Sequence, residues 1–228
     1  MISKKFECVF IHIPKTAGQS IEHFFLKLHG LSWKERSPLL LKYNPDPLKG
    51  PERLAHLKAK EYTSYGYLDN DRFNRYFKFT FVRNPWARLV SEFNYFHYQQ
   101  KMSFEEFVTK GLPAKSDYSD EYRHITPQYD FLYGDSGDCL VDFIGRFENF
   151  QTDFDAICSK LGIENSRLPH VNSSSEKKSL KGLLRICAGL KKPQKRYPYT
   201  EYYNEKTKRI IETIYYKDIE HFNYTFGS

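Results

Sequence analysis

The sequence predicts an α/β fold in which helices flank a central parallel sheet. Three apolar runs rich in aromatic and β-branched residues carry this prediction, at residues 6–12, 76–83 and 138–147. A helical pattern follows each run, and strands that alternate with helices in this way pair in parallel. The 228 residues are enough for a full core, so we expect one domain over residues 1–228, with room for an insertion at about 175–197.

The first strand leads into a loop and then into a helix expected over about 18–28. Four apolar residues at helical spacing share one face of that helix: Ile21, Phe24, Phe25 and Leu28. Proline and glycine punctuate residues 30–51, which predicts a loop. Residues 52–77 show only weak helical patterns.

The second strand is followed by another helix, because Pro85 suits the first helical turn. Further on, Ser103 and Glu106 have the spacing of a capping box ahead of a short helix that ends at Gly111.

The third strand is followed by a helix over about 149–163. Serine and lysine dominate residues 170–198, in which the pattern suggests only a short helix at 179–190. An amphipathic helix is expected over 200–221.

Charge and cysteine content narrow the class of protein. The formal net charge is +7, from 35 basic and 28 acidic residues, which favours an anionic partner: a nucleotide, an acidic glycan, a nucleic acid or a membrane surface. The four cysteines show no C-x-x-C spacing, and Cys8 and Cys139 lie in apolar runs, so we expect buried free thiols. We find no bilayer-spanning stretch and no signal-peptide pattern, and expect a cytoplasmic protein.

The stretch "IPKTAGQS" connects the first strand to the first helix. In such a connection, backbone N–H groups and the helix N-terminus bind anions. Thr16, Ala17 and Gly18 are small enough for the backbone to close around a phosphate-sized group. Thr16 and Ser20 add hydroxyl groups, and Lys15 adds a positive charge. In the usual nucleotide-triphosphate loop the lysine follows the last glycine, whereas Lys15 precedes Gly18.

The second stretch that carries chemistry is "FVRNPWARLVSEFNYF". Arg83 stands at a strand end, where ligands bind in open α/β sheets. Ser91 follows eight residues later on the predicted helix, so that the two side chains could hold one phosphate. Two anion sites at neighbouring strand ends imply a ligand with two separated anionic groups.

Together, "IPKTAG-S" and "VRNPWARLVSEF" resemble the sulfotransferases that use 3′-phosphoadenosine 5′-phosphosulfate (PAPS), in particular the carbohydrate branch of Golgi-type and bacterial enzymes. Three later stretches look like that branch too: "GRFENFQTDFDAICSKLGI", "LPHVNSS" and "YYNEKTKRIIETIYYKDIEHFNY". The resemblance covers most of the chain outside residues 30–55 and 175–197. It implies a P-loop-like three-layer fold and an enzyme that moves a sulfuryl group from PAPS to an acceptor hydroxyl, above all on a carbohydrate, leaving 3′,5′-ADP.

The resemblance also implies roles for individual residues. In the family, the first loop binds the 5′-phosphosulfate, and its lysine reaches the bridging oxygen of the leaving group. These roles would fall to Lys15, Thr16, Ala17, Gly18, Gln19 and Ser20. The Arg and Ser of the second motif bind the 3′-phosphate, as Arg83 and Ser91 would here. Ala17 and Gln19 depart from the family's usual small residues or threonine, which backbone donors tolerate. We expect no metal requirement.

A general base must take the proton of the acceptor hydroxyl. His56, in "RLAHLKAKEY", is the first candidate, because many carbohydrate sulfotransferases resemble this chain in placing a catalytic histidine upstream of the second strand. His124, in "YRHITPQY", is the second candidate and lies in the segment expected to face the acceptor. With a histidine base, activity should rise with pH through about 6.5. If neither histidine matters, Glu22 or Glu52 becomes the better candidate.

Two other classes of protein remain as alternatives. A P-loop kinase of nucleotides or small molecules requires a lysine after Gly18 and an acidic magnesium ligand, where this sequence has Gln19 and "FVRNP". A non-catalytic module that binds acidic glycans or nucleic acids would explain the positive charge. The basic residues between 177 and 196 could form its binding patch. We favour the sulfotransferase and expect no nucleic-acid partner. The acceptor and the oligomeric state leave no signature in the sequence.

Overall fold

The computed structural model describes residues 1–168 and 197–228. The helix predicted at 179–190 and the basic residues between 177 and 196 lie outside these ranges.

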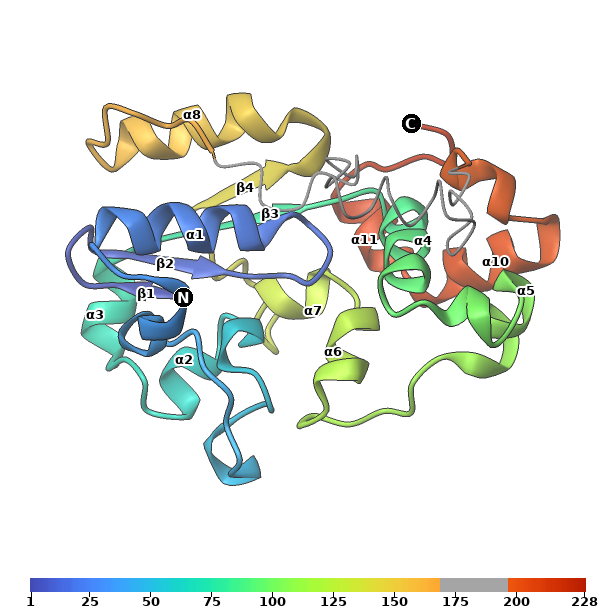
Figure 1. Cartoon of the computed structure of the whole chain (residues 1–228), viewed down its shortest axis with the longest axis horizontal. Coiled ribbons are helices and arrows are strands. Elements are labelled where there is room, and N and C mark those ends of the chain that lie inside the picture. Colours follow the sequence, from blue (N-terminus) through green and yellow to red (C-terminus); the bar gives the residue numbers. More distant parts are fainter. Residues whose placement is uncertain (169–196) are drawn as a thin grey trace, which may run out of the picture.

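A four-stranded sheet of order β1-β2-β3-β4 forms the centre of the fold (Figure 1). Three of its strands are parallel: β2 (Cys8–Ile11), β3 (Phe77–Val82) and β4 (Phe143–Arg146). The edge strand β1 (Ile2–Ser3) runs antiparallel to β2 and is too short to give a sequence signal. The predicted α/β fold with a mostly parallel sheet is confirmed.

Helices cover both faces of this sheet, and the sheet lies between two hydrophobic cores. Helices α1 (Gly18–Leu28) and α8 (Phe150–Lys160) lie on one face, where their side chains meet Cys8 and Phe10 of β2. Val9 and Ile11 point to the opposite core. That face carries α2 (Glu61–Ser64), α3 (Asn70–Arg75) and α7 (Tyr129–Leu132). The alternation of β2 between two cores is what a central strand of a three-layer fold requires.

The helices that follow β3 directly, α4 to α6, gather beyond the carboxyl ends of the parallel strands (Figure 1). Pro85 starts α4 (Pro85–Tyr95) as predicted, and the Asn84 side chain caps it by accepting from two backbone N–H groups. The predicted capping box starts α5 (Phe104–Glu106), which continues as a π-helical turn to Gly111. Helix α6 (Asp120–Ile125) was not predicted, because it is only six residues long.

Two predicted elements were wrong in their boundaries. The helix expected over 200–221 is two helices, α10 (Glu205–Ile214) and α11 (Tyr216–His221). The break falls at Tyr215, whose buried hydroxyl donates to the Ile125 carbonyl at 2.7 Å and so holds the turn in place. Strand β4 begins at Phe143 rather than at 138.

Cys139 is exposed, because it pairs with Tyr133 in an isolated bridge outside the sheet. The free thiols of Cys8 and Cys158 are buried, as the apolar run around Cys8 indicated. No helix within residues 1–168 or 197–228 is long and apolar enough to cross a membrane.

Candidate functional site

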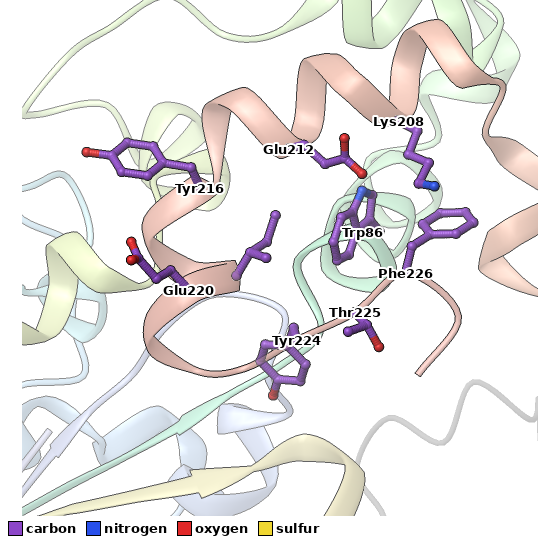
Figure 2. Close-up of a pocket in the computed structure, with 9 residues that line it drawn as sticks. Trp86, Lys208, Glu212, Tyr216, Glu220, Tyr224, Thr225 and Phe226 are labelled. Atoms are coloured by element: carbon purple, nitrogen blue, oxygen red, sulfur yellow. The ribbon is translucent and has the colours of Figure 1, made fainter.

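A pocket of about 450 Å³ lies between α10, α11 and the C-terminal tail (Figure 2). Its lining is mainly aromatic and aliphatic, with Trp86 at one side and Lys208, Glu212 and Glu220 among its few charged groups. None of the sequence-predicted site residues lines it. The titratable and anion-binding groups converge instead at the carboxyl ends of β2 and β3, and we place the candidate active site there.

The loop after β2 has the backbone of an anion-binding site. Lys15 and Ala17 have φ angles of +71° and +66°, in the left-handed region that L-residues rarely adopt. This alternation around Thr16 is the conformation in which successive N–H groups form a nest for an anion. Helix α1 starts directly behind it, and its N-cap residue, Ala17, makes no side-chain hydrogen bond to the first turn. The Ser20 N–H donates to the Ala17 carbonyl at 3.0 Å. The positive end of the α1 dipole therefore faces this loop and favours an anion there.

Two buried contacts hold this loop in shape. The Thr16 hydroxyl donates to the Ile13 carbonyl at 2.8 Å, which gives it a structural task inside the loop. The His12 ring packs under Gly18 so closely that a Cβ there would lie 2.2 Å from a ring carbon. Glycine is therefore required at position 18 by close approach. Gln19 and Ser20 follow, half-buried, in the first turn of α1.

Lys15 points across the site to α4. Its Nζ lies 3.4 Å from the centre of the Tyr95 ring. Burial lowers the pKa of Lys15 to about 8, an effect that nearby Glu92 opposes and that Arg83 and Arg88 reinforce. The ammonium is thus already desolvated, so an anion placed beside it would gain more than it would in water.

Arg83 lies next to the same loop. Its Nη1 donates to the Lys15 carbonyl at 3.2 Å, and its guanidinium lies 4.1 Å from the Phe147 ring centre. Its Nε is buried without a hydrogen-bond partner among the described residues. Burial lowers the pKa of Arg83 to about 10. An unpaired, desolvated guanidinium N–H is costly, and an anionic ligand would satisfy it.

The backbone of Arg83 is also fixed. Both its N–H and its C=O bond to the side-chain amide of Gln128, each at 2.8 Å. Asp218 of α11 in turn accepts from the Gln128 backbone N–H and from its amide. Ser91, the other predicted 3′-phosphate ligand, lies half-buried on α4, and no hydrogen bond joins it to Arg83 in the described part of the chain.

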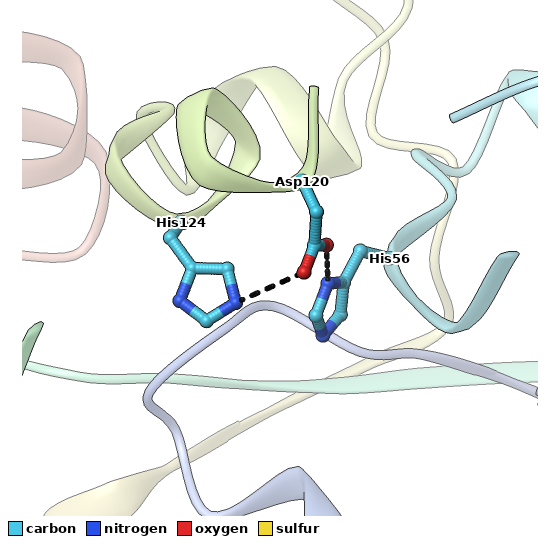
Figure 3. Close-up of side chains that lie close together, drawn as sticks. All are labelled: His56, Asp120 and His124. Atoms are coloured by element: carbon cyan, nitrogen blue, oxygen red, sulfur yellow. Dashed lines mark hydrogen bonds and ion pairs between the residues drawn. The ribbon is translucent and has the colours of Figure 1, made fainter. Parts of the chain in front are cut away.

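The structure brings both candidate bases together. His56 and His124 lie on either side of Asp120, with ring centres 5.2 Å apart (Figure 3). His56 Nδ1 is 2.5 Å from Asp120 Oδ1, and His124 Nε2 is 3.7 Å from Asp120 Oδ2. His12 continues the row, 4.8 Å from the His56 ring. All of these side chains are buried.

Partners on the ring nitrogens distinguish the two candidates. His124 has a carboxylate near each nitrogen, because its Nδ1 is 2.8 Å from Glu92 Oε2. His56 has a partner only at Nδ1, and no hydrogen bond within the described residues engages its Nε2. The fallback carboxylates are engaged elsewhere: Glu22 with His12 Nδ1 at 2.6 Å, and Glu52 with the Asp120 backbone N–H at 3.3 Å. The geometry therefore favours His56.

Burial changes the pH range expected for this base. It lowers the pKa of His56 to about 4, although Asp120 acts in the opposite direction. The sequence-based value of about 6.5 assumed a solvated imidazole and is too high for this site. His56 is a free base over the whole neutral range.

The atoms of His56, Asp120 and His124 that could bind a metal lie within 4.8 Å of one another, a cluster that the sequence analysis overlooked. The 2.5 Å separation of His56 Nδ1 and Asp120 Oδ1 is that of a hydrogen bond. Two ligands of one tetrahedral zinc ion would stand about 3.3 Å apart, given bonds near 2.0 Å. Asp120 is hydrogen-bonded to His56 and makes a longer ion-pair contact of 3.7 Å with His124.

Arg88 is the largest omission of the sequence analysis. This fully buried side chain donates to the carbonyls of Pro14, Thr126 and His124, at 3.0, 3.0 and 2.9 Å. It therefore joins the first loop to the end of α6. The sequence does hold a signal for these residues. Arg88 and Glu92 are four residues apart on one helix, as are Asp120 and His124, so each pair shares a helix face.

We predict that Arg88→Lys lowers the free energy of unfolding by about 2–4 kcal/mol. A lysine cannot reach three carbonyls in the planar geometry of a guanidinium, and buried carbonyls would lose their donors. Denaturant titration followed by tryptophan fluorescence measures the loss. Arg72→Lys, at an exposed ion pair on α3, is the matched control and should change stability by less than about 0.5 kcal/mol. Equal stability of the two variants would contradict a structural role for Arg88.

Comparison with known proteins identifies the family of this chain. A protein of uncharacterised function from Archaeoglobus fulgidus is 33% identical over 107 residues, which cover 46% of this chain and 82% of that protein. No solved structure gives a significant match. The family model described as "Sulfotransferase family" matches residues 1–225, almost the whole length. The chain therefore belongs to the sulfotransferase family.

Proposed function

We propose that the protein transfers a sulfuryl group from PAPS to a hydroxyl group of a carbohydrate. One observation carries the proposal: the hydrogen bond from Arg83 to the Lys15 carbonyl, which joins two anion-binding elements at neighbouring strand ends. A ligand that spans them must carry two separated anionic groups. PAPS has a 5′-phosphosulfate and a 3′-phosphate, whereas a nucleoside triphosphate carries its charge in one chain.

The residues present suit this donor. The nest formed by residues 15–17 and the N-terminus of α1 would hold the 5′-phosphosulfate. The unpaired Arg83 Nε, together with Ser91, would take the 3′-phosphate. Lys15 would neutralise the phosphate that leaves as 3′,5′-ADP.

The protein's own part in the reaction is then small. His56 Nε2 would take the proton as the acceptor oxygen forms its bond to sulfur and the bond from sulfur to the bridging oxygen breaks. Lys15 would meet the charge that develops on that oxygen. This division of work needs no residue beyond those at the two strand ends and the histidine row.

A carbohydrate acceptor fits the surface around the base. Tyr95 and Phe96 are 48% and 38% exposed, and their rings lie 6.1 and 5.2 Å from that of His124. Exposed aromatic rings suit the apolar face of a sugar, and the net charge of +7 suits an acidic one. Donor PAPS with a labelled sulfuryl group, offered with defined glycans, lipid extracts and tyrosyl peptides, distinguishes this acceptor from the others.

Arg83→Ala should weaken binding of 3′,5′-ADP by about 1.5–3 kcal/mol, the worth of hydrogen bonds to a charged group. Binding of 5′-ADP should change little, because it lacks the phosphate that Arg83 is proposed to hold. Isothermal calorimetry with both nucleotides measures the difference. Arg75→Ala is the control, because Arg75 is exposed and lies just ahead of the amino end of β3. If Arg83→Ala keeps the preference for 3′,5′-ADP, the 3′-phosphate assignment is wrong.

Lys15→Ala should reduce kcat more than it reduces affinity for PAPS, because charge on the bridging oxygen grows only in the transition state. The pH profile of kcat/KM for PAPS should be a bell. It rises through about 4 as His56 loses its proton, and falls through about 8 as Lys15 loses its own.

The groups that face the His56 ring in this titration are Asp120 and His124 from α6 and His12, with its partner Glu22, from the other side. In Lys15→Ala the alkaline limb should disappear, whereas Lys27→Ala, on the exposed side of α1, should keep it. An alkaline limb that survives Lys15→Ala would assign it to another group.

A further inference from the structure

Asp120 is the carboxylate at the centre of the histidine row. Its Oδ1 contacts His56 Nδ1 at 2.5 Å, and its Oδ2 contacts Arg53 Nε at 3.1 Å and faces His124 Nε2 at 3.7 Å. It lies on the first turn of α6, 64 residues from His56 in the sequence.

The chemistry of the pair fixes where the His56 proton lies. Burial alone would raise the pKa of Asp120, but the hydrogen bond from His56 and the nearby positive groups lower it to about 2. Asp120 is therefore ionised and can only accept. His56 is neutral at pH 7 and carries one proton, which must stand on Nδ1 for the 2.5 Å contact to be a hydrogen bond. Nε2 then carries the lone pair.

We propose that Asp120 is a positioning residue that holds His56 in the tautomer with the proton on Nδ1, so that Nε2 accepts the proton of the acceptor hydroxyl. The inference rests on the proposed function for the identity of the reaction. It adds a residue that neither the motifs nor the family match assigns.

The surroundings hold Asp120 in place for this task. The Asp120 backbone N–H donates to Glu52 Oε2 at 3.3 Å. Arg123, beside it on α6, forms a two-bond ion pair with Glu61 and donates to the His56 carbonyl at 3.2 Å. The helix that carries Asp120 is thus tied to the backbone of the histidine it orients.

Asp120 would also act on the charge that the reaction creates. When Nε2 takes the proton, the neutral ring becomes an imidazolium in a buried site, which is costly without a partner. The carboxylate at Nδ1 is already in contact and ionised, so no group has to move. One proton is transferred from the acceptor oxygen to Nε2, and Asp120 stays unprotonated throughout.

Asp120→Asn tests this role because Arg53 dictates how the new amide must lie. Arg53 Nε is a donor 3.1 Å from Oδ2, so the amide oxygen should face it and the NH₂ group should face His56. An NH₂ group donates, which leaves Nδ1 as acceptor and moves the ring proton to Nε2. The base would then be blocked without loss of the side chain.

The readout is the tautomer of His56, observed by long-range ¹H–¹⁵N NMR of protein labelled on histidine nitrogens. The His56 signals are those that disappear in His56→Asn. In the unchanged protein near pH 7 we expect a pyridine-type signal from Nε2 and a pyrrole-type signal from Nδ1. In Asp120→Asn the two should exchange. Asp142→Asn is the control, because Asp142 bonds Lys78 near the amino ends of β3 and β4, away from the histidine row. It should leave both signals unchanged.

Two results would overturn the inference: a His56 already protonated on Nε2 in the unchanged protein, or a tautomer that Asp120→Asn does not alter. The first result needs no variant and so does not depend on whether the variant folds. Titration of the same samples with 3′,5′-ADP keeps the two claims separate. Failure of 3′,5′-ADP to bind the unchanged protein counts against the donor assignment, whereas an unchanged tautomer counts against Asp120 alone.

Discussion

A single buried guanidinium links the parts on which the site depends. Arg88 of α4 has three backbone carbonyls as its acceptors, one in the loop after β2 and two at the end of α6. A buried charge is tolerated only when such donors and acceptors are matched, so the positions of these segments are coupled. Helix α6 carries Asp120 and His124, and Asp120 bonds His56. The Arg88 hydrogen bonds therefore fix the position of the anion-binding loop relative to the proposed base.

The free protein carries costs at this site that a bound anion would offset. Lys15 and Ala17 adopt left-handed φ angles without being glycine. Among the described residues Arg83 Nε is buried without a hydrogen-bond partner, and the largely buried ammonium of Lys15 lies over the Tyr95 ring. Strain and desolvated charge gathered in one place indicate a ligand site rather than a structural turn. The pocket beside α10 holds a buried Trp86 Nε1 that has no hydrogen-bond partner within residues 1–168 and 197–228, but Lys208 is the one basic residue in its described lining.

The sequence was informative wherever the signal is local. The strands at 6–12 and 76–83, the first turn at Pro85 and the helix at 18–28 were all predicted, because periodicity, proline and strand–loop–helix patterns act over a few residues. Contacts between distant segments were not predictable. No local pattern around His56 predicts its hydrogen bond to Asp120, and none around Arg83 predicts its bonds to Gln128. The break at Tyr215 depends on a carbonyl 90 residues away, and the exposure of Cys139 depends on where β4 starts.

The central claim is that one donor spans the two strand ends, and a crystal structure with 3′,5′-ADP tests it most directly. The account predicts the 5′-phosphate in the loop of residues 15–20, at the N-terminus of α1. It predicts the 3′-phosphate bonded to Arg83 and Ser91, with Arg83 Nε no longer unpaired. A nucleotide bound with its 3′-phosphate in solvent, or seated instead in the pocket beside Trp86, would contradict it.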